Sequence, residues 1–117
     1  MKVSSNFYLQ EFVDPGSYER FGDSSIWFID KRIITLAQFI RERLGKPCTI
    51  NNWNAGGQYQ FSGFRPPTCT VGASMSQHRF GRGIDLKVKG MTADEVREDI
   101  ITSWEIYKKS TALTTIE

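Results

Sequence analysis

One histidine and one aspartate are the residues in this sequence best suited to metal chemistry. His78 is the only histidine among the 117 residues, and Asp85 follows it in the same short segment. Imidazole nitrogen and carboxylate oxygen are both ordinary zinc ligands. Gly81 and Gly83 lie between them and give the backbone freedom to turn and room beside a bound group. The spacing therefore allows a turn followed by a strand that brings both side chains to one metal ion.

Asp85 stands in an otherwise apolar stretch, where a carboxylate without a partner would be costly. A metal ion would satisfy it. A direct hydrogen bond to His78 would also satisfy it, and so would an ion pair with Arg79 or Arg82, which are close in the sequence. The residues by themselves leave these alternatives open.

Two segments resemble the zinc D-Ala-D-Ala carboxypeptidases and dipeptidases, which belong with the lysostaphin-type and hedgehog-type metallopeptidases. Ser76–Asp85 reads SQHRFGRGID and resembles the family signature S-x-H-x-x-G-x-A-x-D, with Gly83 where alanine is usual. Ser62–Arg65 reads SGFR and is similar to the family's S-G-[YF]-R segment. The order and separation of the segments suit the family, and the resemblance extends over residues 7–116. It is closest to compact members found in phage and prophage genomes.

The resemblance implies a zinc cofactor with His78 and Asp85 as ligands. It also implies that Arg65 holds the carboxylate of a peptide or the developing oxyanion, a role that suits an always-charged guanidinium. Ser76 would form a hydrogen bond with the terminal carboxylate of the substrate. A surface ion pair for Arg65 and a turn or cap hydroxyl for Ser76 are the alternatives that the residues leave open.

A catalytic zinc site normally has three protein ligands and a water molecule. The family takes its third ligand from a histidine in a closing W-x-H segment, and this sequence has no second histidine. Glu117 lacks the context that would assign it the general-base role. We therefore expect a truncated polypeptide, a degenerate member that keeps the fold, or a site completed by a partner chain. Cys69, which lies between Arg65 and His78, is an alternative third ligand.

Two helices are expected to frame these residues. Asp30 is a candidate N-cap and Gly45 a candidate C-terminal stop for the first helix. Thr92 and Glu95 form a capping-box pattern for a second helix, which we expect to run to about Lys109. The first helix is indicated by one apolar stripe at helical spacing, formed by Ile33, Leu36, Ala37, Ile40 and Leu44.

Short strands are expected at residues 48–53, 83–88 and 112–116. In residues 83–88 the apolar side chains alternate with Asp85 and Lys87, which should share the opposite face. This order of elements predicts an α+β domain with a small, largely antiparallel sheet packed by helices, as in the hedgehog/DD-peptidase fold that the resemblance implies.

Two irregular regions flank these elements. Residues 54–76 form a long loop rich in glycine and proline, and loops of this length are more often functional than idle. Its aromatic residues could line a peptide groove or belong to the core. The aromatic residues of this loop region are Trp53, Tyr59, Phe61 and Phe64.

Near the N-terminus, a short helical segment over Asn6–Phe12, capped by Ser5 or Asn6, is expected to end at Asp14-Pro15-Gly16.

The composition describes one ordinary globular domain over residues 1–117, with 39% hydrophobic and 24% charged residues. A net charge of +2, with no basic run interleaved with aromatics, argues against a nucleic-acid partner. No apolar run approaches the roughly 20 residues that span a bilayer, and residues 1–6 show no signal-peptide pattern. Cys48 and Cys69 are expected to be reduced thiols, with a disulfide or a metal-ligand role as the alternatives.

The sequence therefore predicts a peptidoglycan-directed zinc metallopeptidase domain of the D-Ala-D-Ala carboxypeptidase or endopeptidase type, from a phage or prophage. Its partner would be a cell-wall peptide. We expect it to be made in the cytoplasm without a signal peptide and to be virion-associated or released on lysis. The alternative is a non-catalytic member of the same fold, acting as a virion structural component or a cell-wall-binding module.

Overall fold

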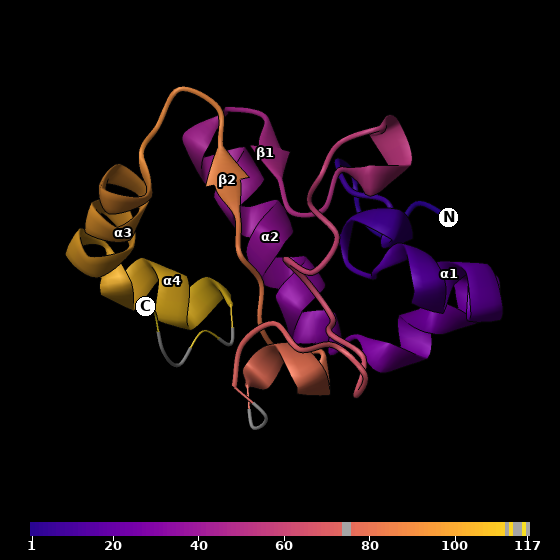
Figure 1. Ribbon diagram of the computed structural model, residues 1–117. Helices are drawn as coiled ribbons and strands as arrows, with labels where there is room; N and C mark the ends of the chain where they lie inside the picture. The colour runs from indigo at the N-terminus through magenta and orange to yellow at the C-terminus, as the bar shows by residue number, and fades with distance from the viewer. Residues whose placement is uncertain (74–75, 112, 114–115, 117) are drawn as a thin grey trace.

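Helix α2 (Lys31–Leu44) runs through the middle of the protein in the computed structural model, which describes residues 1–73, 76–111, 113 and 116 (Figure 1). The Asp30 carboxylate caps it by accepting from the Arg32 N–H, and Gly45 ends it in the left-handed conformation with φ of 63°. Both predicted ends of this helix are therefore confirmed, because each end has a local chemical cause.

A two-stranded antiparallel sheet packs beside α2, formed by β1 (Cys48–Thr49) and β2 (Lys87–Val88). The predicted strands at 48–53 and 83–88 are too long. Beyond Thr49, the Asn51 N–H donates to Glu11 O, and before Lys87 the Asp85 N–H donates to Ser62 O. At this end of the two-residue ladder the backbone is thus bonded to other segments instead of to the partner strand, which ends the sheet early.

Helix α1 (Pro15–Phe21) lies to one side of α2, with the N-terminal segment (Figure 1). The prediction for residues 6–12 is wrong in detail, because the helical turn there is η1 (Leu9–Glu11), with Tyr8 as its N-cap. Asp14 ends that region as expected, but its carboxylate also accepts from the Ser17 N–H and starts α1. Proline at the first position of a helix has no N–H to lose, so a turn signal and a helix start coincide here.

Helices α3 (Ala93–Thr102) and α4 (Trp104–Ser110) lie on the opposite side of α2 (Figure 1). The predicted capping box of Thr92 and Glu95 is present, but the single helix expected to Lys109 is broken at Ser103. Most of the strand expected at 112–116 lies outside the described residues. Leu113 and Ile116 are described, and they pack against a core cluster without belonging to a strand.

Two hydrophobic clusters form the core, and α2 contributes to both of them. The segment that carries Asp85 joins the clusters, because Ile84 and Leu86 on either side of it pack against both. The first cluster contains Phe7, Leu9, Phe12, Val13, Ile29, Ile33, Ile34, Ala37, Ile50 and Phe64. The second contains Leu36, Ile40, Val88, Val96, Ile100 and Tyr107.

The predicted α+β class is confirmed: the described residues form four α-helices and a small antiparallel sheet. None of the helices in this part of the chain has both the length and the apolar character needed to cross a membrane.

Candidate functional site

A short 3-10 helix, η4 (Gln77–Phe80), positions His78. The Ser76 hydroxyl caps it, with its oxygen 3.2 Å from the His78 backbone nitrogen. Gly81 ends it with φ of 68°, and the Gly81 carbonyl accepts from the Asp30 N–H at 2.9 Å. The histidine is therefore held on a tight turn that is fastened to the start of α2.

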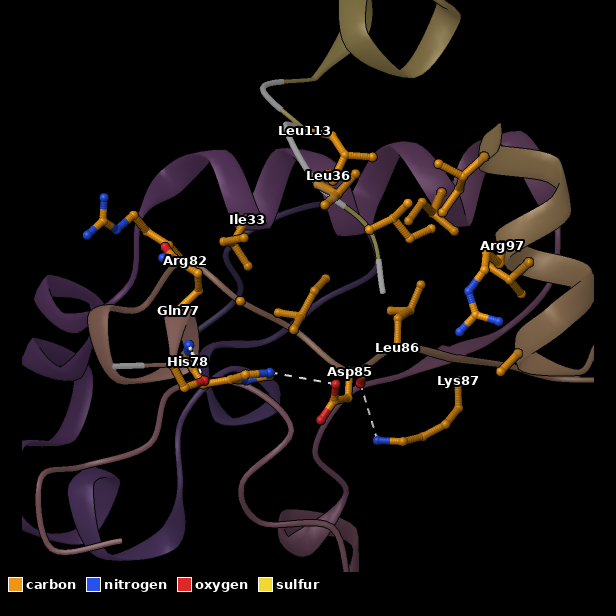
Figure 2. Close-up of a pocket in the computed structure, with 18 of the residues that line it drawn as sticks. Ile33, Leu36, Gln77, His78, Arg82, Asp85, Leu86, Lys87, Arg97 and Leu113 are labelled. Atoms are coloured by element: carbon orange, nitrogen blue, oxygen red, sulfur yellow. Dashed lines mark hydrogen bonds and ion pairs between the residues drawn. The ribbon is translucent and has the colours of Figure 1, made fainter. Parts of the chain in front are cut away.

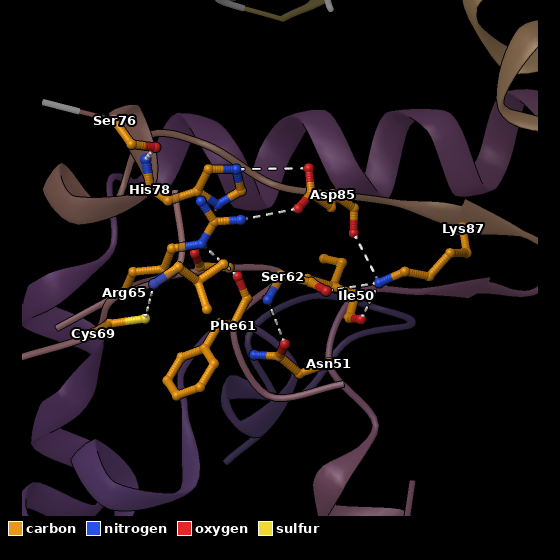
Figure 3. A network of polar contacts seen from close by, with 12 residues as sticks. Ile50, Asn51, Phe61, Ser62, Arg65, Cys69, Ser76, His78, Asp85 and Lys87 are labelled. Carbon is orange, nitrogen blue, oxygen red and sulfur yellow. Dashed lines mark hydrogen bonds and ion pairs between the residues drawn. The ribbon is translucent and has the colours of Figure 1, made fainter. Parts of the chain in front are cut away.

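The His78 ring has one nitrogen bonded to the backbone and the other directed at Asp85 (Figure 3). Nδ1 lies 2.9 Å from Gly63 O, and because a carbonyl only accepts, Nδ1 carries the hydrogen. In the neutral ring this leaves the lone pair on Nε2, which is 3.6 Å from Asp85 Oδ1. A neutral His78 ring thus has its Nε2 lone pair available for a proton or a metal, and a protonated ring forms an ion pair with the Asp85 carboxylate through Nε2.

Asp85 brings together the two segments that resemble the peptidase family. Its Oδ1 faces His78, while Oδ2 accepts from Arg65 Nη2 at 3.2 Å. A hydrogen bond from the protonated His78 ring lowers the pKa of the Asp85 carboxyl, partial burial opposes that effect, and the charges of His78, Arg65 and Lys87 lower the pKa further. The carboxylate is therefore ionised at neutral pH. Its side chain is 58% exposed, so water also stabilises the charge.

Arg65 is buried, and its ion pair is with the partly exposed Asp85. Its Nε donates to Phe61 O at 2.8 Å, and its backbone N–H donates to His78 O at 3.0 Å. A Cβ added at Gly72 would lie 2.5 Å from Arg65 Nη1, so this glycine leaves room for the guanidinium. These contacts fix the arginine so that its guanidinium charge lies beside Asp85.

An open pocket of about 760 Å³ borders these residues (Figure 2). Most of its polar side chains lie around His78 and Asp85, and Arg97 is contributed by α3. Its apolar side chains come from α2, α3, the segment leading into β2, and Leu113 and Ile116. The polar group includes Arg65, Ser76, Gln77, Arg82, Lys87 and Arg97. The apolar group includes Ile33, Leu36, Ile40, Ile84, Leu86, Val96 and Ile100.

The His78 and Asp85 donor atoms fit two ligands of one zinc ion. Two donors at the usual bond lengths in a tetrahedral site lie about 3.4 Å apart, close to the 3.6 Å found here. The bond from Nδ1 to Gly63 O is the outer contact that metal-binding histidines usually make. Among the described residues, however, no group of three His, Cys, Asp or Glu side chains could hold a metal.

Cys69, the alternative third ligand, forms no such group with His78 and Asp85. Its sulfur instead accepts from the Val71 N–H at 3.4 Å, and the thiol is buried and free. Cys48 is also a free thiol, so the expectation of reduced cysteines agrees with the structure. Glu117 lies outside the described residues.

The other sequence candidates have different partners from those expected. Arg79 donates to the backbone carbonyls of the 67–73 loop, and Arg82 lies over the Phe80 ring, so neither makes the ion pair with Asp85 that the sequence left open as an alternative. Of the aromatic residues around the long loop, Phe64 is in the core and stacks on Phe28, whereas Tyr59 is exposed and does not line the pocket.

The sequence did not predict the roles of three polar residues next to the site: Asn51, Ser62 and Lys87. Asn51 Oδ1 accepts from the Ser62 N–H at 2.8 Å, and Lys87 Nζ donates to Ser62 Oγ at 2.7 Å. The strand alternation correctly placed Lys87 on the face of Asp85, but it gave no indication of these partners. Comparison with known proteins adds no further assignment, since the chain matches no family model, no curated protein and no solved structure.

Proposed function

We propose that this chain is a zinc metallopeptidase domain directed at peptidoglycan, of the D-Ala-D-Ala carboxypeptidase or endopeptidase type and with the hedgehog/DD-peptidase fold. One observation carries the proposal: His78 Nε2 and Asp85 Oδ1 face each other at 3.6 Å while Nδ1 is bonded to Gly63 O. The match of these residues to the family signature, and of Ser62–Arg65 to its arginine segment, supports the choice of substrate.

The chain's own residues would divide the work of such a site. Zinc, when bound, would supply Lewis acidity toward a peptide carbonyl. The neutral His78 ring would offer Nε2 to the metal, and Asp85 would offer its carboxylate Oδ1, which faces Nε2 at 3.6 Å. Arg65 places a fixed positive charge beside them, suited to a substrate carboxylate or to negative charge that develops on the carbonyl oxygen. The Ser76 hydroxyl accepts from His78 N and can still donate its own hydrogen to a substrate carboxylate.

The partner in this proposal is a cell-wall peptide, and the setting is a phage or prophage protein that is carried in a virion or released on lysis. The mechanism needs a third ligand and a proton-transferring group in addition to the residues described above.

Zinc binding is the direct test. We expect calorimetric titration to show one zinc ion per chain, with an affinity at least about tenfold weaker in His78→Ala, because one of two described ligands is lost. Gln77→Ala, a neighbouring change that leaves both ligands in place, is the control. The parent protein should also hydrolyse a peptide ending in D-Ala-D-Ala. A protein that binds no zinc and hydrolyses no such peptide would exclude the enzyme.

A non-catalytic role is the second candidate, and a specific observation favours it. The ion pair with Arg65 already satisfies Asp85 without a metal, and the described residues lack a third ligand. In this role the domain would be a virion structural component or a cell-wall-binding module, alone or with a partner chain. Zinc-independent binding of the D-Ala-D-Ala peptide without turnover, lost in Arg65→Met, would favour this candidate over the enzyme.

A further inference from the structure

The Lys87 ammonium lies where three segments of the chain meet behind the site (Figure 3). Nζ donates to Ile50 O at 2.7 Å, to Ser62 Oγ at 2.7 Å and to Asp85 O at 3.3 Å. It also lies 4.0 Å from the centre of the Tyr59 ring. An ammonium has three N–H groups, so each of them has an acceptor here.

Regular strand pairing contributes little to the register of these three segments. The sheet that joins two of them has only two residue pairs, and an isolated hairpin is marginal even when it is longer. Ile50 follows β1, Ser62 begins the segment that carries Arg65, and Asp85 precedes β2. Lys87 is therefore a cross-link between the two motif segments and the end of the sheet.

Ser62 provides a second connection between Lys87 and the Asp85 backbone. Its side chain accepts from Lys87, its carbonyl accepts from the Asp85 N–H at 2.7 Å, and its own N–H donates to Asn51. Ser62 and Asn51 are both buried, so a lost partner would leave a polar group unsatisfied away from water. The position of the Asp85 main chain thus depends on the ammonium through two routes, one direct and one through Ser62.

We propose that Lys87 is a positioning residue that holds the Asp85 carboxylate in reach of His78 and Arg65 by tying the Asp85 backbone to Ser62 and Ile50. The expected effect of Lys87 on zinc binding rests on the proposed function. Its effect on the position of the Asp85 backbone does not.

Amide hydrogen exchange in Lys87→Met tests the backbone statement without zinc. Methionine keeps most of the length of the aliphatic chain and removes the ammonium. We expect the Asp85 amide to exchange about tenfold faster, while the Ile40 amide in the middle of α2 keeps its parental rate. Lys89→Met, at an exposed position on the same segment, should change neither rate.

Zinc titration of the same variants tests the second statement. If the parent binds zinc, we expect Lys87→Met to weaken binding about tenfold, as the loss of outer contacts to metal ligands usually does, and Lys89→Met to leave it unchanged. A parent that binds no zinc refutes the proposed function, and the exchange rates then decide the role of Lys87 by themselves.

Three results would overturn the positioning role. They are an unchanged Asp85 amide, equal acceleration at Asp85 and Ile40, which would mean a general loss of stability, and unchanged zinc affinity in a parent that binds zinc. If Lys87→Met does not fold, Ser62→Ala replaces it. That variant removes only the Oγ acceptor, and we expect it to accelerate the Asp85 amide selectively as well.

Discussion

Gly81 connects the turn that carries His78 to the N-terminal end of α2. Its φ of 68° is in the left-handed region, and a Cβ at this position would overlap the Phe28 carbonyl oxygen. The Gly81 carbonyl accepts from the Asp30 N–H, so the same residue meets the N-cap of α2. Both the conformation and the close approach require glycine here.

Replacing Gly81 by alanine should therefore lower the free energy of unfolding more than replacing a glycine that has a positive φ but no close neighbour. Gly90 is the matched control, with φ of 80° and nothing within 4 Å of an added Cβ. We expect Gly81→Ala to lower the free energy of unfolding by about 3 kcal/mol and Gly90→Ala by about 1 kcal/mol. Urea unfolding followed by tryptophan fluorescence measures both, and equal losses would contradict the overlap with Phe28.

Gly83 is the position at which the motif departs from the family signature, and its surroundings are tight. A Cβ there would lie 3.1 Å from His78 N and 3.2 Å from His78 Cδ2. The alanine that is usual in the family would thus press on the His78 ring in this protein. The small residue at this position and the location of the ring depend on each other.

Among the elements, α2, α3 and α4 are joined by one cluster of polar side chains. Arg43 near the end of α2 donates to Asp99 Oδ2 at 2.9 Å and to Ser103 Oγ at 2.7 Å. The Tyr107 hydroxyl of α4 donates to the same Asp99 oxygen at 2.6 Å. The cluster therefore spans the break between α3 and α4 and binds both helices to α2.

The Asp99 carboxyl should make part of the stability depend on pH. The hydrogen bond from Arg43 holds its pKa below the ordinary value, burial opposes this, and the bond from Tyr107 lowers the pKa further. The unfolded chain therefore takes up the proton first as the pH falls. The stabilisation from Asp99 is complete above about pH 5 and is lost as the pH falls through the folded-state pKa.

Asp99→Asn tests this expectation. At neutral pH it should lower the free energy of unfolding by about 1 kcal/mol, and the difference from the parent should shrink as the pH is lowered toward about 3. Asp94→Asn, on the same helix but 92% exposed, is the control and should have a small effect throughout. Urea unfolding over this pH range measures the effect, and a difference that stays constant in acid would contradict it.

Across the whole molecule, the two hydrophobic clusters are united by α2 and by the segment around Asp85. Ile84 and Leu86 pack against both clusters, so they serve the core while Asp85 between them serves the site. This sharing predicts one cooperative unfolding transition instead of two. It also means that the site is assembled only when both clusters are formed.

Leu86→Ala should therefore weaken the entire protein and not only one cluster. We expect a loss of about 2 kcal/mol, because a partly buried leucine is truncated, with the transition still single. Ile101→Ala, at a side chain 55% exposed on α3, should stay within about 0.5 kcal/mol of the parent. Circular dichroism and tryptophan fluorescence should give the same midpoint for each variant. Two separate midpoints would show that the clusters unfold independently.

The sequence by itself determined the features whose causes are local. The cap at Asp30, the stop at Gly45 and the capping box of Thr92 and Glu95 were predictable, because each needs only residues within one turn of a helix. The strand alternation also placed Asp85 and Lys87 on one face. The single histidine and the nearby aspartate could be chosen as a candidate pair on residue type and spacing.

Only the tertiary structure decided which partners those residues have. The ion pair of Asp85 with Arg65, in place of nearby Arg79 or Arg82, joins residues twenty positions apart in the sequence. The tautomer of His78 depends on a carbonyl fifteen positions away, and the three acceptors of Lys87 come from separate segments. Such contacts depend on how loops pack on one another, and local preferences do not encode that packing. For the same reason, the sheet is shorter and the helix near the C-terminal end is broken where the sequence pattern predicted continuity.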